Sequence, residues 1–132
     1  MKNVIKKVTP ATRQADIDAI PCFEHDRVRA IQAILAKEKK RLPELAELYK
    51  LLSNTTRLKI LLSLAEGELC VCDIAHVLGL STAATSHQLK LLRDQNWLSK
   101  REDGKMVYYR LNNKDLLKAL RGDLAMLETR IG

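Results

Sequence analysis

The most restrictive feature of the sequence is a pair of short helical patterns, residues 72–80 and 82–97, separated by a tight turn. Gly79 supplies the end of the first pattern, and Ser81 is placed to cap the start of the second. Two short helices joined in this way are typical of a helix-turn-helix. The side chains expected to face inward are Ile74, Val77, Leu78, Leu89 and Leu92.

Two strand-like runs, 97–103 and 105–111, follow at once, and Asp103 and Gly104 separate them. This dipeptide is a strong signal for a two-residue β-hairpin, and a hairpin directly after a helix-turn-helix is a wing. Further helical patterns lie at 26–40, 42–52, 56–67 and 112–132. The sequence therefore predicts a mainly α fold with a β-hairpin wing, a winged helix-turn-helix.

The last helical pattern carries an apolar stripe spaced alternately three and four residues apart, as in a helix that packs on another helix. Its members are Leu117, Leu120, Leu124, Leu127 and Ile131. Residues 42–52 carry a second stripe. A helix-turn-helix core of this size has its own faces covered, so we expect a two-fold homodimer that forms through these terminal helices. The alternative is a last helix that lies on its own domain.

The charge balance favours a polyanionic partner. Lysine and arginine number 23 against 16 acidic residues, which gives a net charge of +7 and an isoelectric point near 9.5. The plain alternative is that this charge serves solubility alone. No apolar run is long enough to span a membrane, and the start lacks the apolar core of a secretion signal. We therefore expect a cytoplasmic protein with reduced thiols and no membrane partner.

The second helix of the pair has the side chains that a helix needs in a major groove, because small polar groups near its start let the backbone approach base edges. No acidic residue lies between Asp73 and Asp94. Cations of the wing are placed to meet phosphates. The predicted contacts to double-stranded DNA are Ser81, Thr82, Ala83, Ser86, His87, Lys90, Lys100, Arg101 and Lys105. Each cation taken alone is more often a solvated surface charge.

The three cysteines, Cys22, Cys70 and Cys72, are candidate ligands of a soft metal ion. On a regular helix Cys70 and Cys72 would point about 200° apart, so they share one ion only if the backbone at Cys70 is not helical. Zinc and cadmium take about four donors, which leaves room for a nitrogen or oxygen near Cys22. Asp18 and His25 are candidates. Three thiols would also suit trivalent arsenic, and buried cysteines commonly serve only as small apolar residues.

These patterns divide the chain into an N-terminal arm, residues 1–25, that is flexible and carries a metal ligand, and a DNA-binding and dimerisation domain, residues 26–132. The sequence shows no glycine-rich phosphate loop and no paired acids beside a nucleophile. We therefore expect that the protein is not an enzyme.

Three motifs together resemble the ArsR/SmtB family of metal-responsive bacterial repressors. They are ELCVCD at 68–73, SHQLKLL at 86–92 and GKMVYYRL at 104–111, and the likeness extends over roughly residues 45–125. The resemblance implies a homodimeric winged helix that binds a palindromic operator when it is metal-free. It also implies that a metal or metalloid releases the protein from DNA.

Within that family, Cys22 matches an arm cysteine of cadmium and lead sensors, which join it to the Cys-x-Cys pair of the other protomer. Asp18 stands where a second arm cysteine would fall, and His25 could replace it as in zinc-sensing relatives. Arsenic sensors often have a further cysteine where this chain has Ala75. The resemblance thus favours cadmium, lead or zinc as the effector. A repressor responding to arsenite or antimonite, a thiol-redox repressor and a metal-storage protein remain alternatives.

Overall fold

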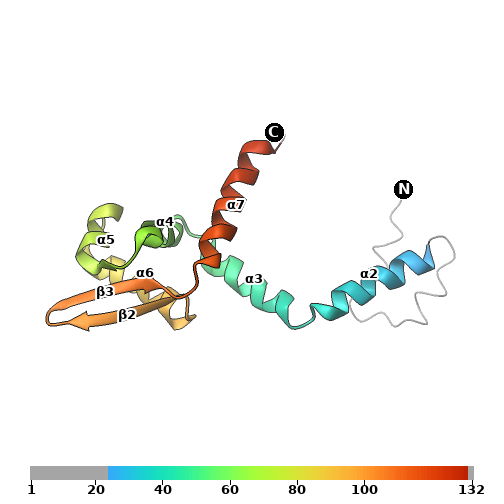
Figure 1. The fold of residues 1–132 in the computed structure, drawn as a ribbon, viewed down its shortest axis with the longest axis horizontal. Helices are drawn as coiled ribbons and strands as arrows, with labels where there is room; N and C mark the ends of the chain where they lie inside the picture. The colour runs from blue at the N-terminus through green and yellow to red at the C-terminus, as the bar shows by residue number, and fades with distance from the viewer. Residues whose placement is uncertain (1–23, 131–132) are drawn as a thin grey trace. The chain divides into compact units, whose positions relative to one another are not determined.

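The computed structural model describes residues 24–130 of the 132-residue chain. They belong to two compact units, Met1–Leu45 and Ala46–Gly132. The first unit contains α2 (His25–Lys37), and α3 (Arg41–Leu52) begins in the first unit and ends in the second (Figure 1). None of the described helices is both long and apolar enough to cross a bilayer.

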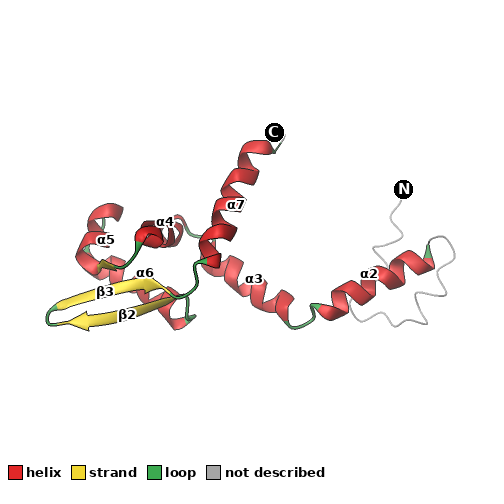
Figure 2. Cartoon of the chain, viewed as in Figure 1, coloured by secondary structure: helices red, strands yellow, loops and turns green. Residues whose placement is uncertain are grey.

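The second unit combines helices with a small antiparallel sheet (Figure 2). After α3 the elements are α4 (Thr55–Ser63), the short 3-10 helix η2 (Leu64–Glu66), β1 (Leu69–Cys70), α5 (Val71–Leu78), α6 (Thr82–Asp94), β2 (Leu98–Asp103), β3 (Met106–Leu111) and α7 (Asp115–Thr129). The predicted winged helix-turn-helix is therefore confirmed, with α5 and α6 as the helix pair and β2–β3 as the wing.

Local side-chain chemistry sets the ends of the helix pair. The backbone at Gly79 is left-handed, with φ of 68°, and closes α5 as the sequence predicts. The Ser81 hydroxyl oxygen then accepts a 3.0 Å hydrogen bond from the Ala84 amide at the start of α6. These two residues fix the tight turn and thereby the placement of α6 after α5.

The sheet contains one strand that the sequence did not predict. Its order is β1-β3-β2, with both pairings antiparallel. The strand β1 has only two residues, which is too short for the alternating pattern that identifies strands. It places Cys70 in the sheet, directly opposite Tyr108 of β3.

The core of the second unit lies among α4, α5, α6, the sheet and the first half of α7. Its fully buried side chains are Ile60, Leu61, Leu64, Ile74, Thr85, Leu89, Leu92 and Leu98. The prediction that Val77 faces inward is wrong, because this side chain is 63% exposed. Helical geometry explains the error: Ile74, Ala75 and Leu78 form the inward face of α5, and Val77 lies about 100° from its centre.

The apolar stripe of α7 serves two purposes instead of one. Leu117 and Leu120 are buried in the core of their own unit, so the expectation that the whole stripe waits for a partner is wrong for this half. The core needs them because the helix-turn-helix does not close its apolar face without α7. Leu124 and Leu127, one and two turns later, are 50% and 51% exposed.

Candidate functional site

Helix α6 presents a continuous exposed face. Thr85, Leu89 and Leu92 are its buried residues, and the Thr85 hydroxyl donates a 2.8 Å hydrogen bond to the Ser81 carbonyl oxygen. The opposite face therefore points outward. It carries the predicted DNA contacts Thr82, Ala83, Ser86, His87 and Lys90, which are all exposed. Their shared face is the one that a major groove would meet.

Two of the predicted α6 contacts already have intramolecular partners. The Ser81 hydroxyl accepts the capping hydrogen bond from Ala84. The Lys90 ammonium donates a 2.7 Å hydrogen bond to a carboxylate oxygen of Asp94, one turn later. This hydrogen bond holds the pKa of the Asp94 carboxyl below its ordinary value. A phosphate that binds Lys90 would therefore compete with Asp94.

The three predicted cations of the wing differ in their surroundings. Lys105 follows Gly104 at the hairpin turn and has no ion-pair partner among residues 24–130. Lys100 lies 3.6 Å from a carboxylate oxygen of Glu102 on the same strand. Arg101, in contrast, is held by several groups at once.

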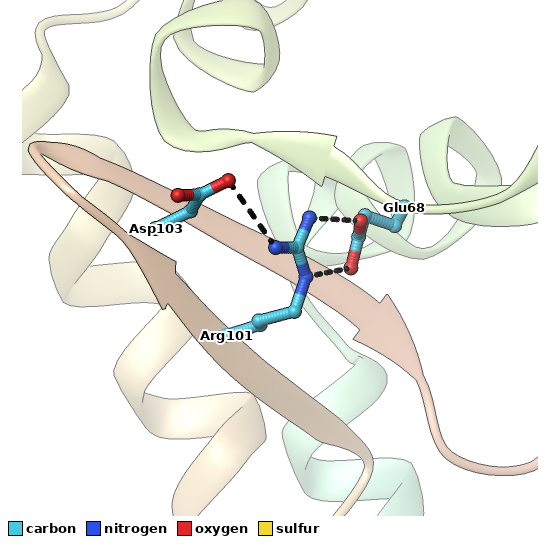
Figure 3. Close-up of polar contacts among 3 residues, drawn as sticks. All are labelled: Glu68, Arg101 and Asp103. Atoms are coloured by element: carbon cyan, nitrogen blue, oxygen red, sulfur yellow. Dashed lines mark hydrogen bonds and ion pairs between the residues drawn. The ribbon is translucent and has the colours of Figure 1, made fainter.

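The Arg101 guanidinium makes a fork-shaped contact with Glu68 (Figure 3). Its Nη2 and Nε lie 2.6 Å and 3.2 Å from the two Glu68 carboxylate oxygens, and Nη1 lies 3.7 Å from Asp103. The guanidinium also lies over the Tyr108 ring, 4.5 Å from its centroid. The hydrogen bonds from Arg101 lower the pKa of Glu68, and the carboxylate in turn raises the pKa of Arg101.

Sequence reasoning missed Glu68 and Tyr108 as partners of Arg101. The residues are far apart in the chain, and only the pairing of β1 and β2 on either side of β3 brings them together. Because β1 was not predicted, the sequence held no signal for this contact.

The thiol pair lies where β1 passes into α5. Cys70 is the last residue of β1, with extended backbone (φ −79°, ψ 159°), and Cys72 lies in the first turn of α5. The expected non-helical backbone at Cys70 is therefore confirmed. Both are free cysteines; Cys70 is 5% exposed, whereas Cys72 is exposed. The two cysteines therefore lie on either side of the first residue of α5, the helix that precedes α6.

The described residues supply only part of a metal site. Between residues 24 and 130, no group of three or more histidine, cysteine, aspartate or glutamate side chains is arranged to hold an ion. Cys22 and Asp18 lie outside the described residues, and His25 is the first residue of α2 in the other compact unit.

An apolar groove lies beside the exposed half of α7. It is lined by Tyr49, Leu52, Leu58, Leu62, Leu120, Asp123, Leu124 and Leu127. Tyr49, Leu62, Leu124 and Leu127 are exposed although they are large apolar side chains. An apolar surface shared by α3, α4 and α7 is the kind of surface that binds another protein.

Comparison with known proteins agrees with this architecture. Residues 54–100 match the family described as "Bacterial regulatory protein, arsR family". A Staphylococcus aureus relative, a cadmium resistance transcriptional regulatory protein CadC homolog, is 39% identical over 100 residues, covering 75% of this chain and 81% of the relative. The arsenical resistance operon repressor of Escherichia coli is 48% identical over 67 residues, covering 50% and 57% of the two chains.

Solved structures share the fold. The homodimeric winged helix-turn-helix DNA-binding domain of a possible ArsR-family regulator from Mycobacterium bovis superposes with a TM-score of 0.62 at 27% identity. The match covers 72% of this chain and 88% of that domain. The sequence relationship to regulators over three quarters of the chain, together with the shared winged fold, shows that this chain belongs to the ArsR family of bacterial regulatory proteins.

Proposed function

We propose that this protein is a repressor that binds operator DNA as a homodimer when metal-free and is released when a soft metal ion binds its thiols. Cys70, Cys72 and Cys22 would hold the ion, with His25 or Asp18 as a further donor. Cadmium, lead and zinc are the candidate effectors. The DNA-contacting groups would be the exposed side chains of α6 together with Lys100 and Lys105 of the wing.

One observation carries this proposal: the two thiols of the second unit lie at the start of α5, the helix that packs on α6. The extended backbone at Cys70 removes the 200° separation that a continuous helix would impose. An ion drawn to both sulfurs would therefore act on the helix that supports the DNA-reading one. The relatedness to a cadmium resistance regulator supports the same assignment.

The thiols Cys70 and Cys72 suit a soft ion, but the second unit of a single chain does not supply enough donors to complete a site. Two sulfurs fall short of the roughly four donors that tetrahedral zinc or cadmium takes. The missing donors would come from the N-terminal residues, either of the same chain or of its partner. Cys22 is the remaining cysteine of the chain.

The exposed apolar groove beside α7 supports a dimer. Leu124 and Leu127 are half exposed, and the α3 side chain Tyr49 lines the same groove. A second copy of these helices would cover this surface, and the related Mycobacterium bovis domain is homodimeric. Two-fold symmetry would present two copies of α6 to the two halves of a palindromic operator.

A trivalent arsenic or antimony effector is the second candidate, because an arsenical resistance operon repressor is 48% identical over 67 residues. Ala75 stands where arsenic sensors often carry a cysteine, so a third sulfur would have to be Cys22.

The decisive experiment is a titration of the DNA-bound dimer with cadmium, lead, zinc and arsenite, followed by fluorescence anisotropy of the operator. Release by one of the three divalent ions, at stoichiometric metal, is the expected result. Release by arsenite alone would favour the second candidate. Release by peroxide and by none of the metals would establish a thiol-redox repressor instead.

A further inference from the structure

We propose that Glu68, Arg101 and Tyr108 form a clamp through which the thiol-bearing strand positions the wing, which makes Arg101 a positioning residue and not a phosphate ligand. This inference rests on the proposed function, because it names the contact that would carry the response from the thiols to the DNA-binding surface.

The register of the sheet aligns the thiol strand with the wing. Cys70 lies opposite Tyr108 in the β1–β3 pairing, and Arg101 lies opposite Tyr108 in the β2–β3 pairing. Directly opposed residues of antiparallel strands project to the same face. Cys70, Tyr108 and Arg101 therefore form one lateral row across all three strands.

This row lies on the sheet face away from the core. The alternate residues Leu69 and Tyr109 pack into the core, so the row must project to the opposite side. Cys70 is nevertheless only 5% exposed and is one of the buried apolar residues of the unit. The thiol is thus enclosed on the same face that carries the Arg101–Tyr108 contact.

The Arg101 side chain connects β2 back to the residue that precedes β1. The Arg101 guanidinium lies over the Tyr108 ring, 4.5 Å from its centroid. It also reaches both carboxylate oxygens of Glu68 (Figure 3). Glu68 lies two residues before Cys70. Strand β1 has two residues and so gives only a short ladder to β3. The forked ion pair therefore adds a second connection between the thiol strand and the wing, with the directional geometry that arginine gives to a carboxylate.

The Arg101 guanidinium is already paired within the fold, so little of its charge is available to DNA. Its two Glu68 contacts and the nearby Asp103 oppose its charge within the fold. Lys105, at the tip of the same wing, has no such partner among the described residues. Of these two wing cations, Arg101 is matched internally and Lys105 is available to a phosphate.

These contacts connect the position of the Cys70 thiol to the position of the wing. Only Leu69 separates Glu68 from Cys70, so a change in the placement of the Cys70 thiolate on metal binding would move the carboxylate that holds Arg101. Arg101 belongs to β2, and β2 carries the wing. The clamp therefore transmits a change at the thiols to the wing without passing through α5 and α6.

The test compares Glu68→Gln with Glu66→Gln, which removes an exposed carboxylate two residues earlier that makes no such clamp. For each protein, cadmium binding is measured by sulfur-to-metal charge-transfer absorption, and operator affinity by anisotropy with and without cadmium. Effector coupling factors are typically about 5–150. Glu68→Gln should bind cadmium with parental stoichiometry, yet its coupling factor should fall about fivefold or more, whereas Glu66→Gln should match the parent.

Arg101→Lys and Arg101→Gln supply the second readout. A lysine keeps the charge but loses the forked geometry, so it should lose coupling as Glu68→Gln does. In metal-free protein, neither variant should change the salt dependence of DNA binding by the slope of about one that a lost phosphate contact produces.

The outcomes separate the two proposals. Parental coupling in Glu68→Gln, or a slope reduced by about one in Arg101→Gln, would overturn the clamp and leave the repressor intact. A parent protein that binds cadmium yet stays on its operator would overturn the proposed effector response and the clamp together.

Discussion

The guanidinium of Arg57 donates a 2.9 Å hydrogen bond to the side-chain amide oxygen of Gln88, and this contact ties α4 to α6. The same side chain donates a 2.6 Å hydrogen bond from Nε to the carbonyl oxygen of Leu51, near the end of α3. Arg57, which lies on α4, therefore joins α3, α4 and α6 at one point. Because Gln88 lies on α6, the contact bears on the orientation of the proposed DNA-reading helix.

Replacing Arg57 should cost more than replacing Gln88. Arg57→Ala leaves the Leu51 carbonyl and the Gln88 amide without their partner, so the free energy of unfolding should fall by about 1–3 kcal/mol. Gln88→Ala loses one hydrogen bond and should cost about 0.5–1.5 kcal/mol. Urea titrations measure both values. An Arg57→Ala protein as stable as the parent would show that this junction does not hold α6.

The tip of the wing should supply affinity and not sequence choice. Lys105→Gln should weaken binding to operator and random duplex alike and should lower the salt slope by about one. Ser86→Ala and His87→Ala should instead reduce the preference for operator over random DNA, by about 1–3 kcal/mol if each reads a base. Affinity measured on both duplexes across a salt series separates the two classes. Equal losses in all three variants would contradict the assignment of α6 as the reading helix.

The two halves of the α7 stripe should respond differently to substitution. Leu117 is 3% exposed within its own unit, so Leu117→Ala should lower the free energy of unfolding by about 2–5 kcal/mol. Leu124 is half exposed, so Leu124→Asp should leave the monomer folded and should shift the protein from dimer to monomer. Analytical ultracentrifugation and circular dichroism report the two effects. A dimeric Leu124→Asp protein would place the dimer contact elsewhere.

The elements that follow local rules were predictable. The caps at Gly79 and Ser81, the hairpin turn at Gly104 and the apolar spacing of the helices depend on neighbouring residues, and the structure confirms them. The winged fold, the family and the absence of an enzymatic role are likewise confirmed.

Most of the features that the sequence did not predict depend on contacts between distant residues. The prediction that Val77 faces inward was wrong because an eight-residue helix has too few turns for the apolar spacing to fix its buried face. The split role of α7 depends on how much of the core the other helices leave open. The clamp around Arg101 needs β1, and two residues carry no periodicity. The metal ligands Cys22, Cys70, Cys72, His25 and Asp18 remain predictions, as do the DNA contacts of α6 and the wing.

The Lys90–Asp94 pair should be visible in a pH titration. The hydrogen bond from Lys90 lowers the pKa of Asp94, with smaller contributions from the charges of Lys90 and Arg93. A lowered carboxyl pKa means that the pair favours the folded state above the ordinary aspartate pKa, and that this contribution is lost as pH falls through the folded value. Carboxyl-carbon NMR should show an Asp94 midpoint below the ordinary value. Lys90→Gln should raise that midpoint, and Lys118→Gln, on α7, should not.

The two thiols of the second unit should separate sensing from DNA binding. Cys72 is exposed, so Cys72→Ser should keep the fold and the metal-free operator affinity but lose release by cadmium. Cys70 is buried, so Cys70→Ser also places a hydroxyl in an enclosed site and should cost about 1–3 kcal/mol of stability.

Cysteine must lose its proton to bind metal, so the parent should release protons on cadmium binding and bind more weakly as pH falls. His76→Gln, which changes an exposed side chain on the same helix, is the matched control and should respond to cadmium as the parent does. Full cadmium release in Cys72→Ser would mean that the sensing thiolates lie elsewhere in the dimer.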